Sequence, residues 1–540
     1  MKNSKIKKLA VIILLIGIFF IASIPAFRSA VYEGHDLNFH LGRIQAIADA
    51  LREGQIPVRY EQNAWYGHGY VSSLYYGNVF LYFPAILYNL GLPIYRVYNI
   101  YIILVNIITV CLGYYSFKRI LKDSYWGIAA TCIYMLAGYR LANLYVRTTL
   151  GEYTAMAFLP LFMYGLYRVY IEKTNVKLYD YWPLIISTTG FIQSHILSTI
   201  MVALYAIVHA VINYKKTFKE IKRILMSIGI VCLINAFFLV PFIQSYFIQD
   251  LNINNSVGGD DISKSGLILK QLFGIVTYNT QTPSEHAPSY NVGLLIILCE
   301  IVSVLWVINI LHRKLKMENG RANQETQGYM FILFVMGIIT SVMSTRYFPW
   351  KIVGRIPVLG ALLTSIQFPS RYILLQTVCF VAVGVYGMSQ LVLSERARNI
   401  IVPSIFALSI LTTAIFDYTL SFGVNITNQN ADEMWADKLY LPVGTKVDEL
   451  VNVNIIEEGD YYILPVLAYD NVCVFDFDGN KIETYKSENN CLEISKQYDP
   501  EMITIAYVEP KLWRIMEIIS LLSVIIFVVR CLYIRIKYSR

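Results

Sequence analysis

The chain has 540 residues, of which 56% are hydrophobic and 15% are charged, and its formal net charge is +8. A soluble domain carries roughly 45–50% apolar and about 25% charged residues, so this composition excludes an ordinary soluble protein. The apolar residues form continuous runs and do not alternate with a period of two, which favours membrane-spanning helices over a β-barrel. Basic residues are spread over short loops between these runs, so a bilayer explains the positive charge better than nucleic acid does.

The first apolar run, residues 9–27, follows a lysine-rich N-terminus. This pattern can open a secretory signal peptide, but the run is longer than the ~7–15 residues of a typical signal. We therefore expect a retained membrane anchor, with cleavage near Ala26 or Ala30 as the alternative.

Twelve apolar segments are expected to cross the membrane. They start near residues 9, 95, 125, 153, 182, 197, 223, 291, 329, 372, 400 and 513. With the N-terminus inside, the basic residues of the inner loops are Lys118, Arg119 and Lys122; Lys173 and Lys177; Lys215, Lys216, Lys219, Lys222 and Arg223; Arg313, Lys314 and Lys316; Arg396 and Arg398; and Arg535, Lys537 and Arg540. This is the positive-inside pattern, so we expect a multi-pass protein of the cell membrane with both termini in the cytoplasm. The pattern holds only if residues 79–92 form a short re-entrant or interfacial helix.

The first outer loop, residues 28–94, opens with Glu33, His35 and Asp36 directly after the first span. Ionisable groups at such a boundary are candidates for function. From Phe39 onward, apolar residues recur at helical spacing, which predicts an amphipathic helix on the membrane surface. Two alternatives stay open: Asp36 or Asn38 caps this helix, or the histidines form a metal site with Asp36. His40 and Arg43 lie one turn apart on the helix.

The second outer segment, residues 140–152, contains Arg140, Arg147 and Glu152. Arginines on the outer side oppose the charge rule, and a phosphate ligand would explain them because guanidinium binds phosphate through paired hydrogen bonds. The alternatives are an ion pair between Arg147 and Glu152, or snorkelling to the headgroups.

Two further outer positions carry polar residues. His195 lies at a helix end in FIQSHILS, where a histidine that only satisfies an interface is the simpler interpretation. Gln367 and Arg371 precede a span in SIQFPSRYILL. Several outer arginines together with an outer acid indicate a site for an anionic lipid headgroup.

Residues 446–510 have a different pattern, with strand-like runs separated by turn signals such as Asp478-Gly479-Asn480. We expect a small extracytoplasmic β domain over residues 419–511, in which Cys473 and Cys491 could pair. The remaining domains are then a membrane core, 1–418, and a last helix with a basic tail, 512–540.

The motifs GHDLNFHLGRI, GHGY, YRLANLYVRTTLGE, SHILS and QFPSRY occur in this order along most of the chain. In this they resemble bacterial membrane proteins described as 6-pyruvoyl-tetrahydropterin synthase-related and the YfhO-type membrane proteins, both of which resemble the GT-C glycosyltransferase superfamily. The resemblance implies a GT-C-like helical fold and sugar transfer from a polyprenyl-phosphate-linked donor to an envelope polymer, glycolipid or protein. No histidine triad for pterin chemistry stands out.

The resemblance also implies roles for residues. Asp36 matches the acid that acts beside the acceptor as a base or through a metal, with His35 or Glu33 tuning it. Arg147 and Arg371 would bind the leaving phosphate. The other substrate-binding candidates are His40, Arg43, Glu152, His195 and Gln367. The loop lacks an acidic pair spaced as DxD or ExD, so the cofactor is unknown and a divalent cation stays open. Other possible functions are a flippase for lipid-linked glycans and a non-catalytic scaffold for envelope assembly.

Overall fold

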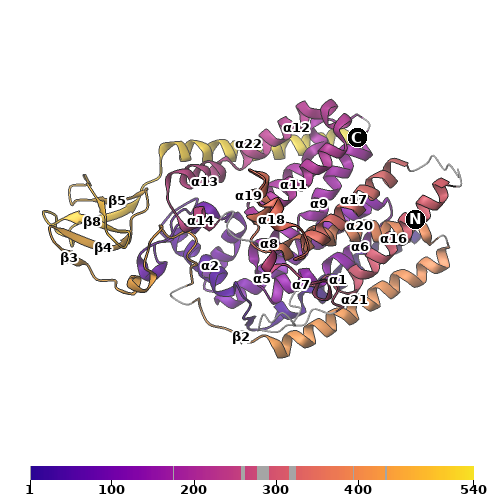
Figure 1. Cartoon of the computed structure of the whole chain (residues 1–540), viewed down its shortest axis with the longest axis horizontal. Coiled ribbons are helices and arrows are strands. Elements are labelled where there is room, and N and C mark those ends of the chain that lie inside the picture. Colours follow the sequence, from indigo (N-terminus) through magenta and orange to yellow (C-terminus); the bar gives the residue numbers. More distant parts are fainter. Residues whose placement is uncertain are drawn as a thin grey trace. The chain divides into compact units, whose positions relative to one another are not determined.

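The computed structural model describes residues 2–173, 175–256, 262–275, 291–315, 324–392, 394–431 and 435–539. The chain divides into two compact units (Figure 1). The first comprises Met1–Leu37, Tyr98–Ser227 and Asp260–Asn428, and the second comprises Asn38–Val97, Ile228–Gly259 and Gln429–Arg540.

The first unit is helical. The helices that lie wholly or mostly in it are α1 (Lys2–Ser23), α5 (Ile94–Leu121), α6 (Ser124–Met135), α7 (Gly138–Tyr145), α8 (Leu150–Met156), α9 (Leu159–Tyr167), α10 (Trp182–Ile192), α11 (Ile196–Ile212), α12 (Tyr214–Ile234), α15 (Leu269–Leu272), α16 (Leu294–Leu315), α17 (Gln324–Met343), α18 (Trp350–Val353), α19 (Leu359–Thr364), α20 (Ile373–Leu391) and α21 (Glu395–Gly423). Two strands, β1 (Val31–Tyr32) and β2 (Ile426–Thr427), pair antiparallel.

Helix α20 packs against both α16 and α17 (Figure 1). It is apolar on all sides and buried along most of its length, as expected of a helix at the centre of a membrane bundle. A Cβ atom at Gly384 would lie 2.6 Å from Cβ of Cys299 on α16. Glycine at this position therefore lets the two backbones approach closely, as small residues do between membrane helices.

Eight helical stretches of the described residues are long and apolar enough to cross a membrane, or nine if the pair α12 and α13 (Ala236–Ile248), bent by 81°, counts as one span. The eight are Lys8–Phe27, Ile94–Leu121, Leu150–Glu172, Leu294–His312, Gln324–Met343, Pro369–Leu391, Glu395–Gly423 and Lys511–Ile534. The chain is thus a multi-pass membrane protein, but the expected count of about twelve is not reached. The segments expected near residues 125, 182 and 197 are helices of 12, 11 and 17 residues, shorter than the ~20 residues that a span needs.

Residues 79–92, which we expected to be a re-entrant or interfacial helix, contain a short apolar helical segment, Val79–Asn89. Its place at the membrane surface stays a prediction. The expected outer segment 247–290 and the basic residue Lys316 lie partly or wholly outside the described residues.

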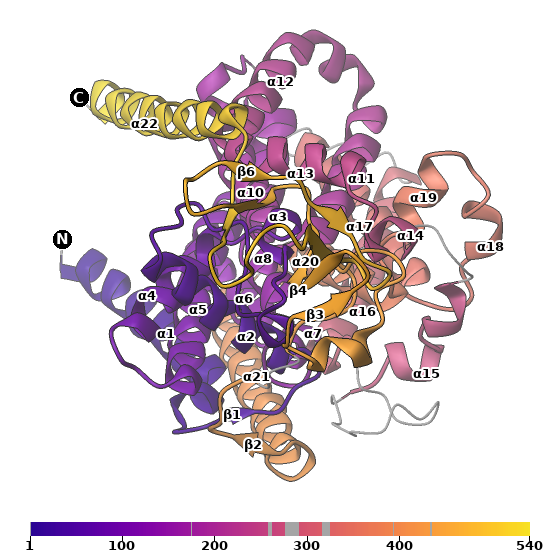
Figure 2. The same ribbon diagram turned by 90° about the vertical axis from the view of Figure 1, so that its left-hand side faces the viewer.

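The second unit combines helices, from the four residues of α3 to the 29 residues of α22, with two small antiparallel sheets (Figure 2). Its helices are α2 (Leu37–Arg52), α3 (Ser72–Tyr75), α4 (Tyr82–Asn89), α13, α14 (Asn252–Ser256) and α22 (Lys511–Ser539). One sheet has the order β3 (Ile456–Glu458), β4 (Tyr461–Leu467), β8 (Cys491–Ser495), β7 (Tyr485–Lys486), and the other the order β6 (Lys481–Ile482), β5 (Val472–Phe475), β9 (Thr504–Tyr507).

Sequence explains the local irregularities of these sheets. The register of β4 against β8 shifts between Ile463 and Leu467, where Pro465 has no N–H to donate. Strands β5 and β6 turn at Gly479, whose φ of 81° suits glycine, and Asp476 accepts a hydrogen bond from the Asn480 N–H at 2.8 Å.

The strands share a hydrophobic core with an earlier part of the chain. One buried cluster joins Leu464 of β4 and Val474 of β5 to Trp65 and Tyr70, which lie between α2 and α3. Cys473 of β5 and Cys491 of β8 are both buried free thiols, so the pairing that we considered is not present.

Glu61 is a buried carboxyl in the second unit. Its Oε1 accepts hydrogen bonds from the Ser72 hydroxyl at 2.9 Å and the Ser73 N–H at 2.8 Å. Burial raises the pKa of Glu61 to about 7. The folded protein therefore binds this proton more tightly than the unfolded chain, and folding stability is lost as the pH rises from about 4.5 to about 7.

Glu61→Gln should mimic the protonated acid and remove this loss. We expect the variant to be more stable than the wild type at pH 8, by on the order of 3 kcal/mol at most, with the difference closing at pH 5. The difference in stability between the variant and the wild type is measured by unfolding in detergent at pH 5 and pH 8. Glu53→Gln, at an exposed carboxyl, is the control. An equal difference at both pH values would contradict the assignment.

Candidate functional site

Helix α7 presents a polar face. Tyr139, Asn143 and Arg147 follow one another at intervals of four residues, which places them on the same side of the helix and its continuation. All three side chains are buried, with Arg147 6% exposed. The Arg147 guanidinium donates from Nη1 to Oδ1 of Asn143 at 2.8 Å and to the hydroxyl of Tyr139 at 3.2 Å. The face is therefore a connected set of hydrogen bonds.

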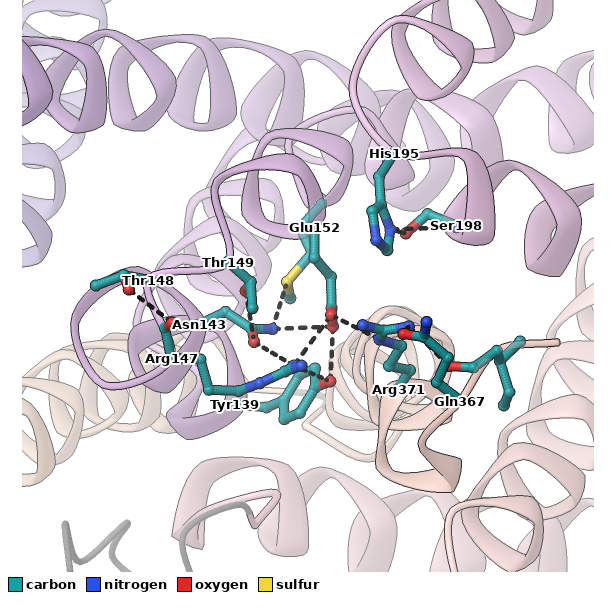
Figure 3. A network of polar contacts seen from close by, with 12 residues as sticks. Tyr139, Asn143, Arg147, Thr148, Thr149, Glu152, His195, Ser198, Gln367 and Arg371 are labelled. Carbon is teal, nitrogen blue, oxygen red and sulfur yellow. Dashed lines mark hydrogen bonds and ion pairs between the residues drawn. The ribbon is translucent and has the colours of Figure 1, made fainter. Parts of the chain in front are cut away.

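Glu152, in the first turn of α8, is the centre of the site (Figure 3). It is 1% exposed. Its Oε1 accepts from the Tyr139 hydroxyl at 2.6 Å and from Nδ2 of Asn143 at 3.2 Å. Its Oε2 lies 3.0 Å from Nη1 of Arg147 and 3.3 Å from Nε of Arg371. One carboxylate thus joins two guanidinium groups that are far apart in the sequence.

Arg371 reaches Glu152 from a short turn, Pro369–Tyr372, before α20. Its Nη1 donates to the Ile366 carbonyl at 2.7 Å and to Oε1 of Gln367 at 3.1 Å. Gln367 is itself exposed and has a positive φ of 66°. Among the described residues, Nη2 of Arg371 makes no hydrogen bond, so this amino group can serve a ligand.

His195 lies beside the Glu152 and Arg371 pair in Figure 3. It caps α11: its Nδ1 accepts from the Ser198 N–H at 3.3 Å and contacts the Ser198 hydroxyl at 2.8 Å. An accepting Nδ1 assigns the proton of a neutral ring to Nε2. Burial, and then the charge of Arg371, lower the pKa of His195 to about 3, so the ring is neutral at physiological pH.

The loop with Asp36 is fixed to the segment that follows α7. The Asp36 N–H donates to the Arg147 carbonyl at 3.0 Å, and the His35 N–H donates to the Val146 carbonyl at 3.3 Å. On its other side the Glu33 N–H donates to the Asn425 carbonyl at 2.8 Å, next to the β1–β2 pair. Asp36 therefore has a defined position beside Arg147.

The carboxyl of Asp36 is half-buried, whereas Glu33 and His35 are exposed. Burial raises the pKa of Asp36, although the charges of Arg147 and Arg371 act in the opposite direction. Helix α2 begins at Leu37, so Asp36, and not Asn38, occupies the position directly before the helix.

Gly34 allows the loop with Asp36 to lie directly against Val146 and Thr148. A Cβ atom there would lie 2.4 Å from Cγ2 of Thr148 and 2.7 Å from the Val146 carbonyl. Gly34→Ala should push the loop away and displace Asp36, at a cost of about 1–3 kcal/mol in stability and with a larger loss of function. Gly17→Ala, where an added methyl meets no atom within 4 Å, is the matched control. Thermal unfolding and a functional assay of both variants test this, and equal behaviour would refute it.

Charge does not balance inside the cluster. Two guanidinium groups face the one carboxylate of Glu152, and His195 is neutral, which leaves one positive charge in a buried place. Uncompensated buried charge is costly, so the cluster favours an anionic partner. Asp36, beside Arg147, is the other carboxyl of the cluster; burial raises its pKa, and the charges of Arg147 and Arg371 lower it.

The structure brings together six of the residues that the sequence singled out: Asp36, Arg147, Glu152, His195, Gln367 and Arg371. The ion pair between Arg147 and Glu152, considered as an alternative to ligand binding, is present. His40 and Arg43 belong to the second unit.

In the second unit, the Arg43 side chain is fully buried. Its guanidinium carbon lies 4.3 Å from the centre of the Tyr76 ring, and its Nη2 donates to the Tyr76 carbonyl at 3.5 Å. His40 is also buried.

Arg140, in the first unit, binds side chains of the protein. Its Nη2 donates to Oδ1 of Asn106 at 2.6 Å and to the hydroxyl of Thr109 at 3.2 Å, both on α5.

Sequence reasoning missed Tyr139 and Asn143. Their spacing of four from Arg147 in YRLANLYVR was the signal that would have found them. Thr149, which donates to Oδ1 of Asn143 at 3.1 Å, carried no such signal.

No three His, Cys, Asp or Glu side chains of the described residues converge as metal ligands. The metal site that the sequence left open at His35 and Asp36 stays a prediction.

Comparison with known proteins gives distant similarities. No family model matches the chain. A protein of Lactococcus lactis subsp. cremoris (strain MG1363), described as uncharacterized, is 20% identical over 351 residues, which are 63% of this chain and 54% of that protein. The match thus spans about half the length of this relative.

Two solved structures have low similarity to this chain. The arabinofuranosyltransferase AftD from Mycobacteria has a TM-score of 0.41 and 9% identity, covering 78% of this chain and 27% of that one. The oligosaccharyltransferase of Archaeoglobus fulgidus in its apo form has a TM-score of 0.40 and 10% identity, covering 80% and 57%. None of these three proteins carries the pterin-related or YfhO-type descriptions.

Proposed function

We propose that the chain is a membrane glycosyltransferase that moves a sugar from a polyprenyl-phosphate-linked donor to an acceptor of the cell envelope, on the extracytoplasmic face. One observation carries the proposal: two buried arginines held by a single glutamate lie beside an aspartate whose pKa burial raises. Four of the five sequence motifs that resemble GT-C proteins contribute residues to this cluster, and the fifth, GHGY, lies in the second unit.

The arginines suit the phosphate of the donor. Guanidinium forms charge-assisted hydrogen bonds with phosphate oxygens, and these strengthen as negative charge develops on the leaving group. Glu152 fixes the orientation of both guanidinium groups while leaving one net positive charge. Nη2 of Arg371 is the donor that the described contacts leave for this role.

In the proposed reaction, Asp36 acts on the hydroxyl of the acceptor. A carboxylate removes the proton from the attacking hydroxyl while the acceptor oxygen forms a bond to the anomeric carbon of the sugar. The bond between that carbon and the phosphate oxygen breaks, and the phosphate leaves with the electron pair toward the arginines. A raised pKa makes Asp36 a stronger base than an exposed aspartate. His195 can donate from Nε2 without adding charge.

The proposal is tested by mass spectrometry of envelope polymers and glycolipids from a deletion strain. The strain is complemented with the wild type, Asp36→Asn or Glu53→Gln, an exposed carboxyl of the same loop, at matched membrane levels. We expect one sugar to disappear on deletion and to return with the wild type and Glu53→Gln, but not with Asp36→Asn.

Full restoration by Asp36→Asn would overturn the role of this residue as a base. Loss of the sugar together with accumulation of lipid-linked glycan on the inner face would favour a flippase instead. Restoration by Asp36→Asn, Arg147→Gln and Arg371→Gln alike would leave a scaffold as the remaining function.

A further inference from the structure

A second candidate site lies in the first unit, on a different face. A groove of about 1040 Å³ runs between α1 and α5. Its walls are apolar: Ile12, Ile16 and Phe20 of α1 face Ile107, Val110 and Cys111 of α5. Most of these side chains are exposed, with Ile12 53% and Phe20 51% exposed, so lipid chains can reach them.

One end of the groove is basic. Lys118, Arg119 and Lys122, at the C-terminal end of α5, line it together with Tyr114 and Tyr115. The Arg119 guanidinium lies 4.5 Å from the centre of the Tyr115 ring, and the Lys118 ammonium lies 5.5 Å from that of Tyr114. Lys122, with a positive φ of 55°, follows the last helical residue. No carboxylate of the described residues forms an ion pair with any of the three.

Basic residues at a helix C-terminus also stabilise the helix dipole and satisfy the positive-inside rule. Neither effect requires them to line a groove with two aromatic rings beneath them. Three cations without carboxylate partners, at the end of an apolar groove, are complementary to a molecule with an anionic head and a hydrocarbon tail.

The length of the groove matches one leaflet. From Ile107 to Lys118 the helix rises by roughly 16 Å at 1.5 Å per residue, about half of a hydrocarbon core of ~30 Å. At its deep end the two helices are joined, because Nδ2 of Asn106 donates to the Ser23 hydroxyl at 2.9 Å and to the Ala22 carbonyl at 3.3 Å. The groove is therefore closed at one end by this contact and basic at the other.

We propose that this groove binds one anionic phospholipid of the leaflet predicted to face the cytoplasm. The acyl chains lie against α1 and α5, and the phosphate lies among Lys118, Arg119 and Lys122. The site shares no residue with the cluster around Glu152 and is independent of the proposed sugar transfer.

Purified, delipidated protein in detergent is titrated with phosphatidylglycerol and, separately, with phosphatidylcholine of the same chains, and binding is counted by native mass spectrometry. Phosphatidylglycerol should bind more tightly. The variant Lys118→Gln, Arg119→Gln, Lys122→Gln should weaken its binding about fivefold for each charge removed, or roughly a hundredfold in total.

The matched control is Lys215→Gln, Lys219→Gln, Lys222→Gln. These three exposed lysines of α12 are predicted to face the same side and lie outside the groove, so their loss should change binding by no more than about twofold. A second variant, Cys111→Trp, keeps every charge but fills the apolar wall, and it should also weaken binding of phosphatidylglycerol.

Equal binding of the two lipids, or full binding by the basic-end variant or by Cys111→Trp, would overturn the proposal. Inorganic phosphate that competes as well as phosphatidylglycerol would also overturn it, because the apolar groove would then contribute nothing. If the basic-end variant does not fold, Cys111→Trp and the comparison of lipids on the wild type still decide.

Discussion

Asp36→Asn is expected to lower the turnover of the purified protein about 100- to 10,000-fold, the range that a positioned general base contributes. The substitution nearly preserves size but removes the group that accepts the proton. The KM for the lipid-linked donor should change much less, because Arg147 and Arg371 are untouched. Initial rates with the donor identified from the deletion strain measure both constants.

The pH profile gives a second readout of the same base. Burial raises the pKa of Asp36 above its ordinary value near 3.8, and the ionised form is needed, so kcat/KM should fall as the pH drops through that raised pKa. His195, whose pKa burial lowers to about 3, stays neutral over this range.

Arg371 adds an internal test. Its charge lowers the pKa of Asp36, so Arg371→Gln should move the acid limb of the profile to higher pH. A limb that stays in place, or that persists in Asp36→Asn, would mean that another group titrates.

Glu152→Gln is expected to destabilise the protein by about 3–5 kcal/mol, the usual cost of removing one partner from a buried ion pair. The substitution leaves Arg147 and Arg371 facing each other without their carboxylate and places an amide group where an acceptor is required. Thermal unfolding in detergent measures the loss.

Glu172→Gln is the matched control for this second prediction. Glu172 pairs with Arg168 at 3.5 Å and is 27% exposed, so the loss there should be below about 1 kcal/mol. If Glu152→Gln costs no more than Glu172→Gln, the cluster does not depend on its central carboxylate.

Much of the membrane architecture could be predicted, because apolar runs long enough to span are visible without tertiary information. All twelve expected segments contain helix, but α6, α10 and α11 are short; α11, for example, begins after the capping residue His195, close behind the end of α10 at Ile192. Hydropathy alone counts such segments as spans.

The site was predictable in composition but not in geometry. Outer arginines drew attention to Arg147 and Arg371, since they opposed the charge rule. Their shared contact with Glu152 joins segments more than two hundred positions apart, and no local pattern encodes that distance. Asn143 had a local signal in its spacing from Arg147 and was still missed, because a neutral asparagine was not weighed as a hydrogen-bond partner of that arginine.

The pairing of β1 with β2 has a consequence for biosynthesis. Val31 lies opposite Thr427 and Tyr32 opposite Ile426, so the loop with Asp36 is tied to residues made late in translation. A nascent chain that has inserted its first helices still lacks this tie, and such non-local contacts form late. The ribosome must therefore complete α21 before this tie can form, and a chain truncated before residue 426 lacks it but keeps the bonds of the loop to Val146 and Arg147.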